Sequence, residues 1–235
     1  MNSNVISIDG PSGSGKTSIG KELAKRLHAE FISSGMVYRA LSLNIGEACE
    51  GGKYSKYLNN VSKFYEAAQS ERFQLKIIDL SNYEISVQYS DTSTNEKFIV
   101  RTKFDDNLLY SAENSFLTSK MSQLNILRKI TSEYLRGNVH NNNLTVIEGR
   151  DIGSVVFKDA ILKIYIDSPI ELRAKRRLSQ SSENEGLKEI SERDKMDSIR
   201  ENSPLIVPDG AFIILNENQT IDEIVDFIEE EYKDL

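Results

Sequence analysis

A glycine-rich segment near the N-terminus carries residues suited to binding phosphate. It reads Gly10-Pro-Ser-Gly-Ser-Gly-Lys-Thr17 and has the pattern G-x-x-x-x-G-K-[ST], between an apolar run and a helix-like run. In this pattern consecutive backbone N–H groups turn toward an anion, and the helix start adds partial positive charge. Lys16 is expected to reach the outer phosphates of a nucleoside triphosphate, and the Thr17 hydroxyl to hold Mg2+. The alternative is an exposed Gly/Ser turn. The residues predicted to contact the triphosphate are Gly10, Pro11, Ser12, Gly13, Ser14, Gly15, Lys16, Thr17 and Ser18.

Arginines are the second group of residues that could do chemistry. Transfer of a phosphoryl group between two anions needs positive charge around the moving group and little else from the protein. A nucleoside monophosphate acceptor needs no general base, because its phosphate has a second pKa of about 6 and is largely dianionic at pH 7. Neither His28 nor His140 is expected to be catalytic. The arginines in or beside segments predicted to flank the nucleotide are Arg39, Arg150, Arg173, Arg176, Arg177, Arg193 and Arg200.

Strands and helices that alternate along the chain must position these residues. The alternation predicts an α/β fold, a three-layer sandwich of the P-loop NTPase type with a central parallel sheet flanked by helices. The carboxyl ends of such strands form one edge of the sheet, where ligands bind, and residues 10–17, 33–39 and 148–151 are expected to meet there. Buried strands are predicted at 5–8, 144–147, 160–166 and 212–215, a short apolar step at 30–32, and helices at 17–28, 36–48, 56–69, within 105–137, from 168, over 187–200 and from 220.

The stretch from residue 73 to residue 104 has a different character. Three β-like runs at 73–78, 83–89 and 97–100 follow one another with no helix between them, which predicts a small antiparallel insert. The chain is otherwise expected to be a single domain over residues 1–235. Residues 180–186 are polar and are expected to form a loop.

Composition excludes several function classes. The chain has 235 residues, 39% hydrophobic content and a net charge of −7, which argues against broad attraction to nucleic acid or anionic lipid. No apolar run approaches the ~20 residues of a membrane span, and residues 1–4 do not form a signal-peptide start. Cys49 is the only cysteine, which excludes an intramolecular disulfide. A small enzyme of the cytoplasm is expected.

These residues together resemble the bacterial cytidylate kinases over nearly the whole chain. The phosphate-binding loop matches that family closely, and Ser34-Gly35 with Tyr38-Arg39 matches its monophosphate-site element. The stretch from Gly149 to Phe157, Gly-Arg-Asp-Ile-Gly-Ser-Val-Val-Phe, is similar to the family's Gly-Arg-Asp-x-Gly-Thr-Val-Val-Phe. Further matches are the insert followed by Arg101-Thr102, the spacing of Ser119 and Arg128, and the segment 192–205 with Asp197, Arg200 and Pro204.

The resemblance implies an enzyme that phosphorylates CMP and dCMP with ATP and Mg2+, as a monomer without nucleic-acid or membrane partners. It implies catalytic roles for Lys16, Arg150, Arg200, Arg173 and Arg176, and a mobile lid over about 173–200 that includes Arg177. The insert, about 73–104, would lie on the monophosphate side. Asp151 is expected to accept a hydrogen bond from the N4 amine of cytosine, which uracil could not supply. The residues implied to bind CMP are Ser34, Tyr38, Arg39, Ser119, Arg128, Arg150, Asp151, Arg193, Asp197 and Arg200.

Two departures from the family pattern accompany the resemblance. Glu148 stands where the family has Asp, which shifts any contact to Mg2+ through a water molecule, and the spacing between Arg101 and Ser119 is longer than the family's. Three alternatives remain open at this point: a P-loop kinase for another nucleoside monophosphate or shikimate, a nucleotide-dependent switch, and an inactive paralogue. No Asn-Lys-x-Asp guanine-reading element is present for a guanine-specific switch, and Lys16, Thr17, Arg150 and Arg200 are all present.

Overall fold

The computed structural model describes residues 3–50, 60–69, 73–140, 143–180, 187–200 and 202–234. The chain divides into two compact units, one formed by residues 1–34 and 135–235 and the other by residues 35–134. Among the described helices, none combines the length and hydrophobicity that crossing a bilayer requires.

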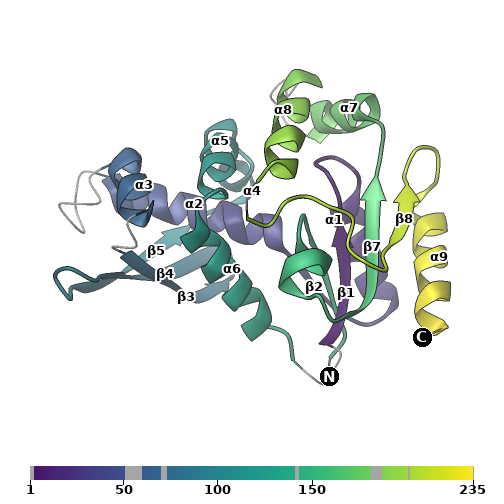
Figure 1. The fold of residues 1–235 in the computed structure, drawn as a ribbon, viewed down its shortest axis with the longest axis horizontal. Coiled ribbons are helices and arrows are strands. Elements are labelled where there is room, and N and C mark those ends of the chain that lie inside the picture. The colour runs from purple at the N-terminus through teal and green to yellow at the C-terminus, as the bar shows by residue number, and fades with distance from the viewer. Residues whose placement is uncertain are drawn as a thin grey trace. The chain divides into compact units, whose positions relative to one another are not determined.

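A parallel sheet organises the first unit (Figure 1). Within its described residues, five strands lie in the order β2-β6-β1-β7-β8, and every neighbouring pair is parallel. The predicted α/β fold with a central parallel sheet is therefore confirmed. The strands are β1 (Ser3–Asp9), β2 (Glu30–Ser33), β6 (Thr145–Gly149), β7 (Ala160–Asp167) and β8 (Phe212–Leu215).

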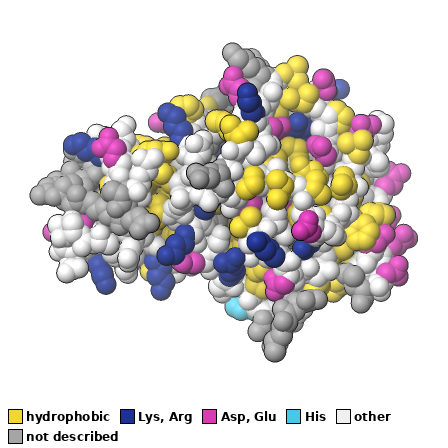
Figure 2. All heavy atoms as spheres, in the orientation of Figure 1, with side chains coloured by type: hydrophobic (Ala, Val, Ile, Leu, Met, Phe, Trp, Pro, Cys, Tyr) yellow, Lys and Arg dark blue, Asp and Glu magenta, His cyan; other side chains and the backbone are white. Residues whose placement is uncertain are grey.

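Helices α1 (Lys16–Arg26) and α9 (Ile221–Lys233) pack on the same face of this sheet. Ile6 and Ile8 of β1 join them in one buried apolar cluster, since alternate residues of a strand point to the same face. Thr220 and Glu223 form a capping box that starts α9. The outward side of α9 is acidic (Figure 2), and Arg26 of α1 forms ion pairs with its carboxylates.

The opposite face of the sheet carries a short π-helix, η2 (Ile152–Val156), directly after the turn that follows β6. Ser7 and Asp9, which alternate with Ile6 and Ile8, point toward it: a Cβ on Gly153 would lie 2.5 Å from the Ser7 Oγ. Beyond β7 come α7 (Ile170–Gln180) and α8 (Leu187–Ser198), which pack against each other. Helices were predicted at both of these positions, whereas η2 was not.

The second unit combines helices with an antiparallel sheet. Its described strands, in the order β3-β4-β5, confirm the three predicted runs. Asn44 of α2 donates to the Val100 carbonyl and the Thr102 hydroxyl and accepts from the buried Tyr89 hydroxyl, so α2 is tied to this sheet. The elements are β3 (Phe73–Ser81), β4 (Glu84–Asp91), β5 (Lys97–Lys103), α2 (Ser34–Cys49), α3 (Val61–Gln69), α4 (Asp106–Leu109), α5 (Ala112–Met121) and α6 (Asn125–Gly137), whose last residues belong to the first unit.

Several boundaries differ from those predicted. The helical pattern predicted within 105–137 is formed by three helices, because Ser111 caps α5 and residues 122–124 separate α5 from α6. The second unit begins at residue 35, well before the predicted insert, since α2 packs with it. The loop predicted at 180–186 begins one residue later than predicted, because Gln180 is the last residue of α7. Its residues 181–186 lie outside the described residues, as does the start of the predicted helix, 56–59.

Candidate active site

The glycine-rich loop connects the carboxyl end of β1 to the first turn of α1. Gly10 has φ 147°, and a Cβ there would lie 2.0 Å from the Ile166 carbonyl oxygen, so only glycine fits. Gly15 has φ 100° and stands at the position that precedes α1. The two glycines let the loop fold back over the helix start, which is the geometry of an anion site at a helix N-terminus.

Lys16 is the basic residue of this loop, and hydrogen bonds within the loop fix its side chain. Its side chain is buried, and its Nζ donates to the Pro11 carbonyl at 2.6 Å and to the Ser14 hydroxyl at 3.4 Å. The ammonium group therefore lies inside the curve of the loop, where the phosphates of a nucleotide would lie. Asn216, just after β8, donates from Nδ2 to the Ser14 carbonyl at 2.9 Å and braces the loop from behind. Thr17 and Ser18 are exposed on the first turn of α1.

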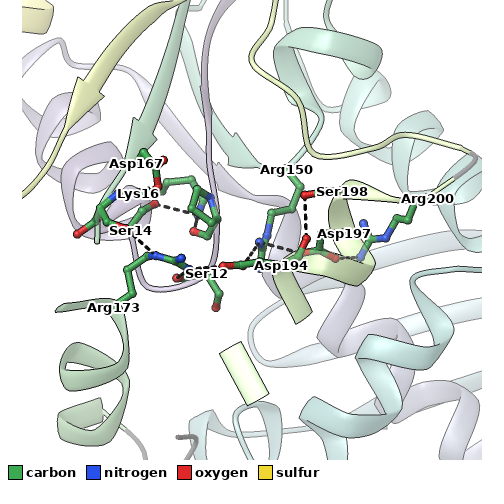
Figure 3. Close-up of polar contacts among 12 residues, drawn as sticks. Ser12, Ser14, Lys16, Arg150, Asp167, Arg173, Asp194, Asp197, Ser198 and Arg200 are labelled. Carbon is green, nitrogen blue, oxygen red and sulfur yellow. Dashed lines mark hydrogen bonds and ion pairs between the residues drawn. The ribbon is translucent and has the colours of Figure 1, made fainter. Parts of the chain in front are cut away.

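Three of the predicted arginines meet two aspartates in a single network (Figure 3). Arg150, in the turn after β6, lies with Nη1 2.8 Å from the Asp197 carboxylate and 3.8 Å from that of Asp194. Arg200 also binds the Asp197 carboxylate. Arg173 of α7 pairs with Asp194 at 2.5 Å and donates to the Ser12 carbonyl at 3.1 Å, so the network reaches the glycine-rich loop.

Arg176 lies one helical turn beyond Arg173 and faces the end of β8. It donates to the Ser168 hydroxyl at 3.2 Å and to both oxygens of Asn216, the backbone one at 3.3 Å and the side-chain one at 3.2 Å. Burial lowers the pKa of its guanidinium, which stays protonated at any physiological pH. Arg176 thus contacts the residue that braces the loop. The side chains of Arg177 and Arg193 lie outside the described residues.

Asp9, which sequence reasoning missed, fixes the turn that carries Arg150 and Asp151. Its fully buried carboxylate accepts the backbone N–H groups of Ile152 and Gly153, both at 2.7 Å. Burial raises the pKa of Asp9 from 3.8 to about 7, although the two N–H bonds oppose this shift. Asp151 is itself buried at the start of η2, close enough for its charge to raise the pKa of Asp9 further.

Glu148 and Thr17 are the residues that could hold a metal ion. Glu148 is buried at the end of β6 and accepts a hydrogen bond from the Ser33 hydroxyl. Its register partner on β1 is Ile8, so its side chain shares the face of the sheet that α1 covers. An Mg2+ ion that bridges nucleotide phosphates takes only one or two protein ligands, and hydroxyl and carboxylate oxygens suit it. These two residues fit such an ion.

The second unit holds four further residues predicted to bind the acceptor, namely Tyr38, Arg39, Ser119 and Arg128. Arg39 of α2 is buried and donates from Nη1 to the Ser115 hydroxyl at 2.8 Å and to the Leu109 carbonyl at 3.2 Å. The guanidinium of Arg128, on α6, lies 5.9 Å from the ring centre of Tyr38 on α2. The unit therefore brings Tyr38 and Arg128 together.

Two further predicted residues are Ser119 and Ser34. Ser119 is half-buried near the end of α5. Ser34 begins α2 and is buried, with its hydroxyl 2.5 Å from where a Cβ on Gly149 would lie. The first unit thus unites the loop, Arg150, Arg173, Asp197 and Arg200. The residues that hold the predicted ones or their turns, and to which sequence reasoning gave no role, are Asp9, Ser33, Asp194, Asn216 and, beside Arg39, Ser115.

Comparisons with known proteins identify the family of this chain. The family model described as cytidylate kinase matches residues 6–234. The chain is 32% identical to the cytidylate kinase of Fusobacterium nucleatum over 97% of this chain and 96% of that protein. It is 36% identical to the bifunctional pantoate ligase/cytidylate kinase of Prochlorococcus marinus (strain MIT 9301), but it spans only 43% of that protein's length. A shikimate kinase structure from Acinetobacter baumannii matches with a TM-score of 0.44 and 13% identity, over 98% of this chain and 93% of that one. The family model over nearly the whole length, together with the identity to full-length relatives, shows that the chain belongs to the cytidylate kinase family.

Proposed function

We propose that this chain transfers the γ-phosphoryl group of ATP to CMP and to dCMP, giving ADP and CDP or dCDP. The observation that carries the proposal is the network in which Arg173 touches Ser12 of the glycine-rich loop and connects through Asp194 to Arg150. A loop that binds a triphosphate needs no such arginines for binding alone. Positive charge extending from the loop is what a phosphoryl group needs while it passes between two anions.

On the donor side, the loop amides and Lys16 would hold the ATP phosphates. The Nζ of Lys16 already lies within the loop, so few degrees of freedom are lost when phosphate oxygens replace the Pro11 carbonyl and the Ser14 hydroxyl as its partners. Mg2+, held by Thr17 and through water by Glu148, would neutralise charge on the ATP phosphates. Arg173 and Arg176 would stabilise the phosphoryl group in transit.

On the acceptor side, Arg39, Arg150 and Arg200 would clamp the CMP phosphate, with Ser34 and Tyr38 beside it. Arg150 and Arg200 share the buried carboxylate of Asp197, which lets two cations lie close together before the phosphate binds. Arg193 and Asp197 would face the sugar. The dianionic phosphate then attacks the γ-phosphorus of ATP in line, without a general base.

Recognition of cytosine would fall to Asp151, Ser119 and Arg128. A carboxylate accepts from the N4 amine of cytosine, whereas uracil presents an oxygen at that position and would repel it. Asp151 is buried, so an unpaired charge there would be costly, which is how such a site rejects the wrong base.

The proposal further includes closure of α7 and α8 as a lid over the phosphates, the insert at 73–104 on the acceptor side, and a monomer acting in the cytoplasm.

Stoichiometric product analysis tests this function. The protein is incubated with Mg2+–ATP and CMP, and nucleotides are separated by anion-exchange chromatography. CDP and ADP are expected to form in equal amounts. Formation of ADP without CDP would mean hydrolysis and would contradict the proposal, and Lys16→Ala gives the background for contaminating kinases.

A further inference from the structure

Asp194 of α8 lies between two arginines that come from different segments of the chain (Figure 3). One carboxylate oxygen, Oδ2, is 2.5 Å from the Nη1 of Arg173 on α7. The other, Oδ1, is 3.8 Å from the Nη1 of Arg150 in the turn after β6. Asp194 thus connects the arginine that touches the glycine-rich loop with the arginine assigned to the acceptor phosphate.

The charges of the network alternate. From Arg173 through Asp194, Arg150 and Asp197 to Arg200, each cation has a carboxylate next to it. Guanidinium groups do not lose their protons in proteins, so cations this close repel one another unless carboxylates separate them. Asp197 lies between Arg150 and Arg200, and Asp194 lies between Arg150 and Arg173.

The hydrogen bonds of Arg173 show how its contact with Asp194 orients the guanidinium group. Its Nε donates to the Ser168 carbonyl at 2.8 Å, and its Nη1 donates to the Ser12 carbonyl and to Asp194. Among the residues that the structure describes, its Nη2 has no hydrogen-bond partner. Asp194 therefore fixes one edge of the guanidinium and leaves Nη2 for a phosphate oxygen.

We propose that Asp194 is a positioning residue, which holds Arg173 and Arg150 so that both present their charge to the phosphoryl group in transit. The inference rests on the proposed function, because it gives those arginines a shared target. Positioning of this kind acts on the transition state more than on substrate binding. Loss of Asp194 is therefore expected to lower kcat more than it raises either KM.

The test compares Asp194→Asn with Glu192→Gln, which removes one negative charge from an exposed position of the same helix. Asp194→Asn is expected to lower kcat about 10-fold or more, with KM for ATP and CMP changed by less than about 3-fold. Glu192→Gln is expected to leave kcat unchanged. Asp194→Glu, which restores the charge at a shifted position, is expected to give an intermediate kcat, and it replaces the Asn variant if thermal melting shows that variant unfolded.

A double-variant cycle then separates positioning from a general loss of structure. Because Asp194 acts through Arg173 as well as Arg150, adding Asp194→Asn to Arg173→Met should lower kcat by a smaller factor than Asp194→Asn does in the unaltered protein. Unchanged kcat in Asp194→Asn, an equal loss in Glu192→Gln, or independent losses in the double variant would overturn the inference. Failure of the proposed function is a different result, because the unaltered protein would then not phosphorylate CMP. In that case kcat of the same variants would be measured with the acceptor that the unaltered protein does phosphorylate.

Discussion

Replacement of Asp9 by Asn is expected to remove a specific part of the pH dependence of stability. Asp9 is fully buried at the end of β1, and burial raises its pKa from 3.8 to about 7. A raised pKa means that the folded chain binds this proton more tightly than the unfolded chain. The free energy of unfolding contributed by Asp9 is therefore greatest when the group is protonated, falls as pH rises from about 4 to about 7, and is constant above that.

The magnitude follows from the size of the shift. Each pH unit between the two pKa values changes the free energy of unfolding by about 1.4 kcal/mol. Between pH 5 and pH 8 the pKa of about 7 gives a fall of about 2–3 kcal/mol from this group. Asn cannot titrate, so Asp9→Asn should lack this fall. At both pH values Asp9→Asn also leaves the backbone N–H group of either Ile152 or Gly153 without an acceptor. This loss lowers the free energy of unfolding by about 1–3 kcal/mol.

Urea unfolding at pH 5 and pH 8 measures this directly, with the unaltered protein and Asp9→Asn compared at each pH. The difference between the two proteins in free energy of unfolding should shift by about 2–3 kcal/mol between the two pH values, with the unaltered protein losing more as pH rises. The other titrating groups are present in both proteins, so the comparison removes most of their contribution. Equal pH dependence in both proteins would refute the raised pKa and the reasoning built on the burial of Asp9.

Further predictions concern the reaction. Lys16→Ala should lower turnover by about 1,000-fold with the fold intact by circular dichroism, whereas Lys21→Ala, an exposed lysine of the same helix, should be near normal; near-normal turnover in the first would contradict the role given to Lys16. Asp151→Asn should reduce the preference for CMP over UMP, measured as the ratio of kcat/KM, by about 10-fold, and an unchanged ratio would remove Asp151 from the base site. Ser115→Ala should raise KM for CMP about 5-fold, because Arg39 loses its 2.8 Å partner; a KM equal to that of the unaltered protein would show that this bond does not orient Arg39. Chelation by EDTA should abolish turnover and added Mg2+ should restore it, so turnover that persists in EDTA would argue against metal assistance.

The sequence predicted the local features of the fold well, because each depends on a short pattern. The glycine-rich loop needs eight consecutive residues, and the strands of the parallel sheet are short apolar runs. The π-helix η2 was not predicted, since the apolar run Ile-Gly-Ser-Val-Val is equally typical of a strand and π-helices are rare. The start of the second unit at residue 35 depends on contacts of Asn44 with β4 and β5, which no spacing reveals.

The difference between local patterns and contacts of distant residues also explains which site residues were given no role. Asp9 lies 143 residues from Ile152, the N–H of which it binds, and Asp194 lies 21 residues from Arg173 on a separate helix. Asp9 looks like an ordinary aspartate in its local sequence, whereas Asp194 stands in the segment 192–205 that resembles the family, but nothing in that segment indicates its partner Arg173. One signal for Asp9 was available in the sequence. Asp9 stands directly before the first glycine of the phosphate-binding loop, and a negative charge is unexpected beside a site for anions. Arg39, Arg150 and Arg200 were predicted from motifs, and the roles given to them stay predictions.

The release of ADP from Mg2+–ATP, measured as initial rates with CMP, dCMP, UMP, AMP, GMP and shikimate in turn, tests the central claim most directly. Strong stimulation by CMP and dCMP, with little by the other acceptors, is the result expected of a cytosine-reading site built from Asp151, Ser119 and Arg128. Equal or stronger stimulation by another acceptor, or none by any of them, would contradict the proposed transfer to CMP.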